Sequence, residues 1–134
     1  MRIVLISVLD SFVLSSVACA EDILPLKHGY YVSNGTECAK ASNATLNLYN
    51  GDHVGGAHMD CGKAKSHQVD ATTYKVTTPC RDMQGGSSPV LMEDTYTVAS
   101  DHEYSVTNQY GSFKSRYCPQ SQLPEPWHSN SIGK

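Results

Sequence analysis

The sequence predicts an all-β, mainly antiparallel domain: a small barrel or sandwich of about six to seven strands that carries two disulfides. Three observations predict this class. Several short segments alternate apolar and polar residues with a period of two, and they are rich in Tyr, Val and Thr. Turn-forming residues separate them by short connections, which join antiparallel neighbours because parallel pairing needs a long crossover. Four cysteines remain once a leader segment is set aside.

The clearest strands are residues 73–77, 95–99 and 103–107, each of which contains a Tyr-x-Val core. In a strand, residues two apart share a face. The Tyr and Val of each segment are therefore predicted to face the core, and the intervening Thr, Lys and Ser to face solvent.

Four less regular segments are predicted to complete the sheet: residues 30–32, 45–49, 57–61 and 112–117. In the second of them Leu46 and Leu48 point inward, and in the third Ala57, Met59 and Cys61 share a face. In the last segment Phe113 and Tyr117 lie on one side. The only helix-like stretch, residues 37–42, is long enough for one or two turns.

Two stretches are predicted to lack regular structure. Residues 83–94 contain a Gly-Gly-Ser-Ser-Pro run and are expected to form a long loop. Residues 119–134 hold three prolines and are expected to form an extended, Pro-rich C-terminal tail with frayed residues 128–134. Two N-x-T sequons, at Asn34 and Asn43, fit surface loops.

Residues 1–20 are predicted to be a removable signal peptide. A basic start, an apolar run and an A-x-A site that ends at Ala20 form the pattern that a signal peptidase recognises. A membrane anchor is disfavoured because Asp10 interrupts the apolar run. A lipoprotein that begins at Cys19 is a lesser alternative, since position 16 is Ser. The mature chain is then one disulfide-stabilised β domain, residues 21–118, followed by the tail, and it is periplasmic or secreted.

The four remaining cysteines, Cys38, Cys61, Cys80 and Cys118, are predicted to form two disulfides, as is usual in a small exported domain. Four cysteines allow three connectivities. Cys38–Cys61 with Cys80–Cys118 is slightly preferred, because it would tie each half of the domain separately. A zinc site is disfavoured because no two of these cysteines have the close C-x₂₋₄-C spacing.

The composition excludes several function classes. The net charge is −3 and no basic run occurs, which argues against a nucleic-acid partner. No nucleophile elbow or phosphate loop is present. The neighbours Glu93 and Asp94 would point to opposite faces of a strand, so they make a poor acid–base pair. We therefore predict no enzyme activity, no cofactor and no stable membrane span after cleavage; a hydrolase is the least favoured alternative.

Three weak site signals stand out. His53 and His58 flank a glycine-rich turn near two aspartates and are candidate metal ligands, with surface histidines as the plainer interpretation. Ser87 and Ser88 in the predicted loop are candidate partner contacts. Trp127, the only tryptophan, is either an anchor for a partner or a residue that folds back to cover an open end of the sheet.

Two stretches carry a resemblance. Cys-Ala-Lys-Ala-Ser-Asn-Ala-Thr-Leu at 38–46 and Tyr-Cys-Pro-Gln-Ser-Gln-Leu-Pro-Glu-Pro-Trp at 117–127 resemble small, uncharacterised exported proteins of alphaproteobacteria, including rhizobia. The resemblance implies a periplasmic setting and no particular activity. A looser likeness, in size and strand count, is to periplasmic inhibitors of C-type lysozyme. Their Ser-Gly-x-x-Tyr loop is absent, and residues 86–89 are a poor substitute.

These observations favour a non-enzymatic exported β domain that binds a protein partner or an envelope component. The alternatives are a carrier of a metal ion or small ligand that uses His53 and His58, and a protein similar to the lysozyme inhibitors.

Overall fold

The computed structural model describes residues 20–83, 85 and 88–132. Within them the chain is almost entirely β-structure, with nine antiparallel strands in one sheet and two short 3₁₀ turns. The strands are β1 (Gly29–Ser33), β2 (Leu46–Tyr49), β3 (Val54–Gly56), β4 (Met59–Cys61), β5 (Lys65–Gln68), β6 (Thr73–Asp82), β7 (Val90–Ser100), β8 (Glu103–Asn108) and β9 (Gly111–Cys118). The predicted fold class is confirmed, with more strands than predicted.

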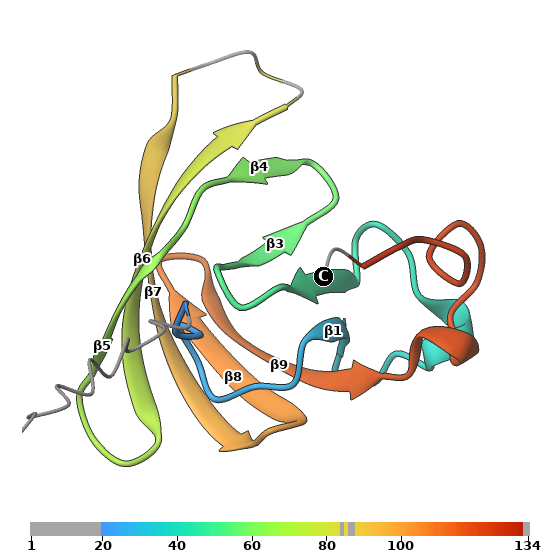
Figure 1. The fold of residues 1–134 in the computed structure, drawn as a ribbon, viewed down its shortest axis with the longest axis horizontal. Helices are drawn as coiled ribbons and strands as arrows, with labels where there is room; N and C mark the ends of the chain where they lie inside the picture. The colour runs from blue at the N-terminus through green and yellow to red at the C-terminus, as the bar shows by residue number, and fades with distance from the viewer. Residues whose placement is uncertain (1–19, 84, 86–87, 133–134) are drawn as a thin grey trace, which may run out of the picture.

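The sheet curls into a nearly closed barrel (Figure 1). Its strand order is β3-β2-β1-β9-β8-β7-β6-β4, and β5 pairs with β6 beyond the end of β4. The two end strands, β3 and β4, follow one another in sequence through a short turn at Ala57 and His58. The last gap in the barrel therefore lies between β3 and β4.

The barrel interior is filled by the residues that the alternation places inward. Val76, Tyr96, Val98 and Tyr104 are buried there, and the Tyr and Val partners in β6 and β8 are partly buried against them. This confirms the predicted faces of the three Tyr-x-Val strands. The Phe113 side chain, which lies opposite Val106 of β8, is 50% exposed.

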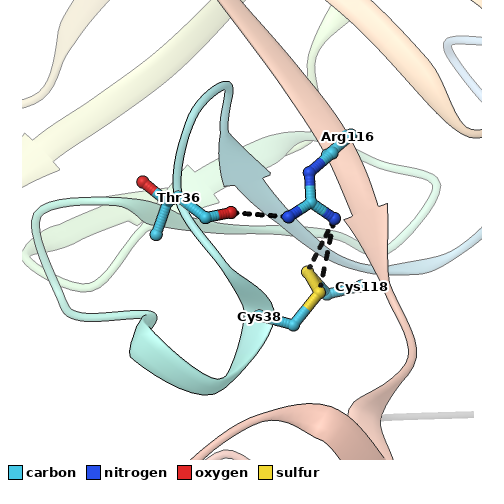
Figure 2. Close-up of a disulfide and its surroundings, with 4 residues drawn as sticks. All are labelled: Thr36, Cys38, Arg116 and Cys118. Carbon is cyan, nitrogen blue, oxygen red and sulfur yellow. Dashed lines mark hydrogen bonds between the residues drawn. A yellow bond between two sulfur atoms is a disulfide. The ribbon is translucent and has the colours of Figure 1, made fainter.

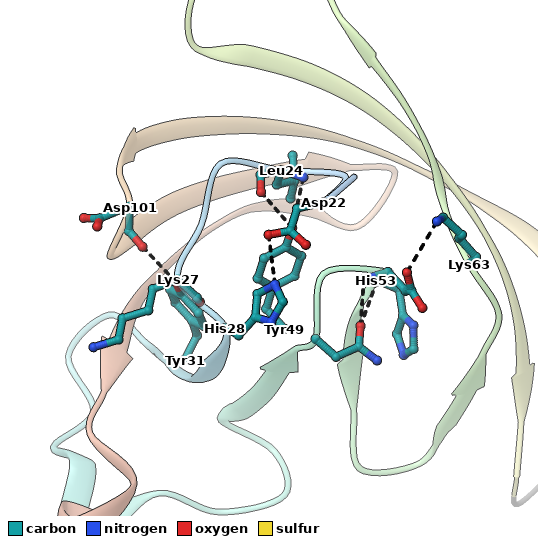
Figure 3. A network of polar contacts seen from close by, with 11 residues as sticks. Asp22, Leu24, Lys27, His28, Tyr31, Tyr49, His53, Lys63 and Asp101 are labelled. Atoms are coloured by element: carbon teal, nitrogen blue, oxygen red, sulfur yellow. Dashed lines mark hydrogen bonds and ion pairs between the residues drawn. The ribbon is translucent and has the colours of Figure 1, made fainter. Parts of the chain in front are cut away.

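An N-terminal strap, residues 20–28, closes one end of the barrel (Figure 3). Ile23 and Leu24 insert into the interior cluster. The Tyr49 hydroxyl accepts a hydrogen bond from the Leu24 N–H (3.0 Å) and donates one to the Leu24 carbonyl (2.7 Å). Tyr31 at the same end donates to the carbonyls of Lys27 and Asp101. No sequence pattern predicts this strap, because it has no regular secondary structure.

The C-terminal segment is not the predicted extended tail. It turns back through η2 (Gln120–Gln122) and a run of turns, and it covers the outer face of β1 and β2. Leu123 is buried there and Trp127 packs beside it, while the Gln120 Nε2 amide donates to the Trp127 carbonyl (2.8 Å). Residues 128–132 continue this fold instead of fraying. The prolines fit because none lies within a strand, where a ladder N–H would be needed: Pro119 caps η2, Pro124 precedes a turn and Pro126 lies in it.

The two disulfides are Cys38–Cys118 and Cys61–Cys80, so the preferred pairing was wrong. The sheet register decides the pairing. Cys61 and Cys80 are directly opposed in the β4–β6 ladder. Cys38, in η1 (Cys38–Lys40), follows β1, and β1 pairs with the end of β9, where Cys118 lies. Both bridges point to an oxidising environment.

Arg116 covers the Cys38–Cys118 bridge (Figure 2). Its Nη2 donates to the Thr36 carbonyl at 2.6 Å, and Nη1 lies 3.5 Å from the Cys38 Sγ. The guanidinium thus ties the loop after β1 to β9 next to the covalent link.

The predicted set of strands and the boundary of one predicted loop are also corrected. Strand β5 was missed because all four of its residues are exposed, so it shows no apolar alternation. The predicted loop 83–94 is shorter, because β7 already begins at Val90. The run Val90-Leu91-Met92 followed by two acids does not alternate, although it is paired with β6 throughout.

Candidate functional site

The β6–β7 hairpin extends beyond the rest of the barrel (Figure 1). β7 pairs with β6 from Val90 to Thr97, but its pairing with β8 begins only at Thr95. Residues 90–94 therefore have β6 on one side and no described strand on the other. We call this segment the free β7 edge.

The ladder fixes which backbone groups of the free β7 edge are unpaired. The Val98 N–H donates to the Thr72 carbonyl, and the register to β6 runs without a break from there to Val90. In an antiparallel ladder, alternate residues direct both backbone groups to the same neighbour. Even-numbered residues of β7 thus face β6, and the N–H and C=O groups of Leu91 and Glu93 face away from it.

A cleft of about 730 Å³ lies along this edge, between β7 and the β8–β9 turn. Its large apolar side chains are unusually open to solvent: Val90 is 60% exposed, Leu91 70% and Tyr110 74%. Apolar residues scattered singly over a surface need no explanation, but a group of them around one cleft marks an interaction site. An exposed, unprotected strand edge adds to this signal.

The cleft is acidic. Among the described residues that line it, Asp82, Glu93 and Asp94 are acids and none is basic. The Asp94 carboxylate accepts a hydrogen bond from the Asn108 amide at 2.8 Å, which fixes the end of β8 against β7. The site therefore favours a partner that brings positive charge together with apolar surface.

The Cys61–Cys80 disulfide holds the strand beneath the free β7 edge in place. Cys80 is the register partner of Val90, and the bridge joins β6 to β4 at that point. The edge is thus built on a covalently fixed hairpin, which lowers the ordering cost that a partner must overcome on binding.

The structure describes only one of the two predicted partner contacts in the loop. Ser88 is exposed just before β7, at the border of the site, and Ser87 lies outside the described residues. Sequence reasoning selected this region as a loop and missed its main features, Leu91, Glu93 and Tyr110. The sequence signal that could have located this strand is the apolar run Val90-Leu91-Met92, which comes shortly before the predicted strand 95–99.

Trp127 and His53, which belong to different hypotheses in the sequence analysis, line one smaller pocket of about 270 Å³ at β2 and β3. This pocket shares the lining residue Met59 with the cleft. Tyr30, Asn43, Asn47 and Asn130 also line it. The His53 Nδ1 atom is buried and has no hydrogen-bond partner. This pocket combines aromatic surface with amide donors and acceptors.

The two candidate metal ligands, His53 and His58, lie on either side of β3. His58 lies in the β3–β4 turn, where its carbonyl accepts a hydrogen bond from Met83. The part of the chain that the structure describes contains no group of three or more His, Cys, Asp or Glu residues that could hold a metal ion.

Fold and site together define a disulfide-linked, nearly closed antiparallel barrel in which residues 90–94 of β7 extend past the described strands on one side. Comparison with protein-family models, curated proteins and solved structures found no match for the chain. Over residues 20–83, 85 and 88–132, no helix has the length and apolar character needed to cross a membrane.

Proposed function

We propose that this protein is an exported, non-enzymatic domain that binds a protein partner at the cleft along the free β7 edge. The observation that carries the proposal is the exposure of Val90, Leu91 and Tyr110 around one acidic cleft. Protein interfaces of this kind gain most of their binding energy when central apolar and aromatic side chains become buried inside a polar rim.

Export is supported by two features. The two disulfides require an oxidising compartment to form and persist. The strap also buries Ile23 and Leu24, and a mature chain that starts after Ala20 keeps both of these core residues. A cleavage point a few residues later would remove part of the core.

The test is comparative capture from an envelope extract, with the mature protein immobilised. The site variant is Leu91→Ser/Tyr110→Ala, and the matched control is Val69→Ser, an apolar residue of similar exposure outside the cleft. We expect a defined protein that is retained by the wild type and the control but weakened at least tenfold in the site variant, as loss of about 1.4 kcal/mol or more requires. Identical retention by all three proteins would refute the proposal. A C-type lysozyme is added as a purified candidate, because of the looser resemblance.

The Trp127 pocket supports a second candidate function, the binding of a small ligand with an apolar face and several hydrogen-bonding groups. Trp127 is the only tryptophan, so its fluorescence reports occupancy directly. Titration with small polar metabolites of the envelope should shift its emission in the wild type and not in Asn43→Leu, a change at an exposed residue of the pocket lining. A spectrum that no tested compound changes would remove this candidate.

A further inference from the structure

We propose that the partner binds as an extended segment that adds a strand to the free β7 edge, with Lys or Arg side chains placed beside Glu93 and Asp94. This inference rests on the proposed function and specifies the form of the partner.

The backbone argues for strand addition. Leu91 and Glu93 each direct one N–H and one C=O away from β6, and the described residues place no strand against them. An incoming strand can satisfy all of these groups at once, as in other proteins that bind peptides by extending a sheet. The register continues into β6 and the Cys61–Cys80 bridge, so the template is already ordered.

The side chains indicate the partner's composition. Residues 90–92 are apolar and residues 93–94 are acidic, so the edge changes character along its length. Opposite charges on facing strands stabilise a pair, and like charges destabilise it. The added segment should therefore carry apolar side chains beside Val90, Leu91 and Met92, and basic side chains beside the two acids.

The same acids argue against a second copy as the occupant. Only Leu91 and Glu93 offer outward backbone groups, so a symmetric antiparallel pair would be centred on Met92. That register sets Leu91 against Glu93 and Val90 against Asp94, and it gathers four carboxylates on one short ladder. Apolar–acid pairs and mutual repulsion both weaken such a dimer.

The first experiment measures amide hydrogen exchange of the free and bound mature protein by NMR. In the free protein the amides of Met92 and Asp94 should be protected by β6, and those of Leu91 and Glu93 should exchange freely. The probe is a library of random peptides displayed on phage and selected on the wild-type protein. Strand addition predicts that a selected peptide slows exchange at Leu91 and Glu93 by at least tenfold. Unchanged exchange at both amides in the complex would overturn the proposal.

The second experiment uses a matched pair of variants at one position. Glu93→Ala removes the carboxylate and keeps the N–H, while Glu93→Pro removes both; proline is tolerated on a strand edge where its nitrogen faces solvent. We expect selected peptides rich in Lys or Arg to bind Glu93→Ala several-fold more weakly than wild type, and Glu93→Pro at least tenfold more weakly than Glu93→Ala.

These outcomes separate the inference from the proposed function. Equal binding to Glu93→Pro and Glu93→Ala would show docking through side chains alone and refute strand addition, while the partner site itself would stand. Selected peptides without excess basic residues would refute the charge assignment. Peptides that bind the Leu91→Ser/Tyr110→Ala variant as well as the wild type would instead remove the site. Exchange at Leu91 and Glu93 in the free wild type tests the open edge even if the proline variant fails to fold.

Discussion

Removal of the two disulfides one at a time should destabilise the domain unequally. The Cys38–Cys118 bridge closes a loop of 80 positions, and the Cys61–Cys80 bridge closes one of 19. The loop-entropy relation gives a loss of about 4.5 kcal/mol for the first bridge and about 3.2 kcal/mol for the second. Both cysteines of the first bridge are buried, whereas in the second bridge Cys80 is buried and Cys61 is partly exposed, so cavity formation adds to the larger loss.

The assay is equilibrium unfolding in urea without reductant, comparing the wild type with Cys38→Ala/Cys118→Ala and Cys61→Ala/Cys80→Ala. Mass mapping of non-reduced peptides first verifies the pairing in the wild type. We expect the Cys38/Cys118 variant to lose more free energy of unfolding, by about 1.3 kcal/mol or more. An equal or larger loss in the Cys61/Cys80 variant would refute the reasoning. Fragments linked as Cys38–Cys61 would refute the sheet register itself.

Three further changes test the closed end of the barrel. Tyr49→Phe leaves the buried Leu24 N–H without a partner and should cost about 1–3 kcal/mol in urea unfolding, with faster exchange of the Leu24 amide. Gly51→Ala should cost about 1–3 kcal/mol by the same assay, since φ is +92° and a Cβ there would lie 2.5 Å from the Asp22 Oδ1; an unchanged midpoint would contradict the strap's position. Burial raises the pKa of Tyr49 and Tyr104 to about 12, above the ordinary value of 10.0. Because the folded-state pKa is the higher one, this stabilisation is complete below about pH 10 and is lost as the pH rises through about 12, so the free energy of unfolding should fall across that window.

The elements predicted correctly are those whose information is local. Alternation alone predicts which side chains of β6 and β7 face the core: Tyr74, Val76, Tyr96 and Val98. This works because the pattern of a half-buried strand does not depend on which strands lie beside it. Strand β1 is buried on both faces, so alternation says little about it, and its position follows only from its partners β2 and β9.

Long-range information accounts for the errors. Cys38 and Cys118 meet because β1 and β9 are neighbours, although they lie at opposite ends of the domain sequence. The strap and the C-terminal turns acquire their positions from the barrel that they cover, so Leu24 and Trp127 reveal little in isolation. The expectation that each bridge ties one half of the domain was the wrong guide, because antiparallel order brings distant strands together.

The sequence analysis selected the region of the candidate site but predicted a loop where the structure has a strand. Gly, Ser and Pro before Val90 predict an irregular connection, which lies partly outside the described residues. The strand that follows was assigned to the loop because Val90, Leu91 and Met92 do not alternate. Lack of alternation on a paired strand means that neither face is uniformly covered, which is what an overhanging hairpin produces.

The acids at the end of the free β7 edge explain how such an edge persists in a stable protein. Apolar strand edges attract other edges, and proteins usually protect them with charge or cover them. Glu93 and Asp94 supply that charge beside the apolar residues, and they repel a second copy that carries the same pair. A segment with basic side chains reverses the sign of this interaction. One pair of carboxylates therefore opposes self-association and, in the proposed function, selects the partner.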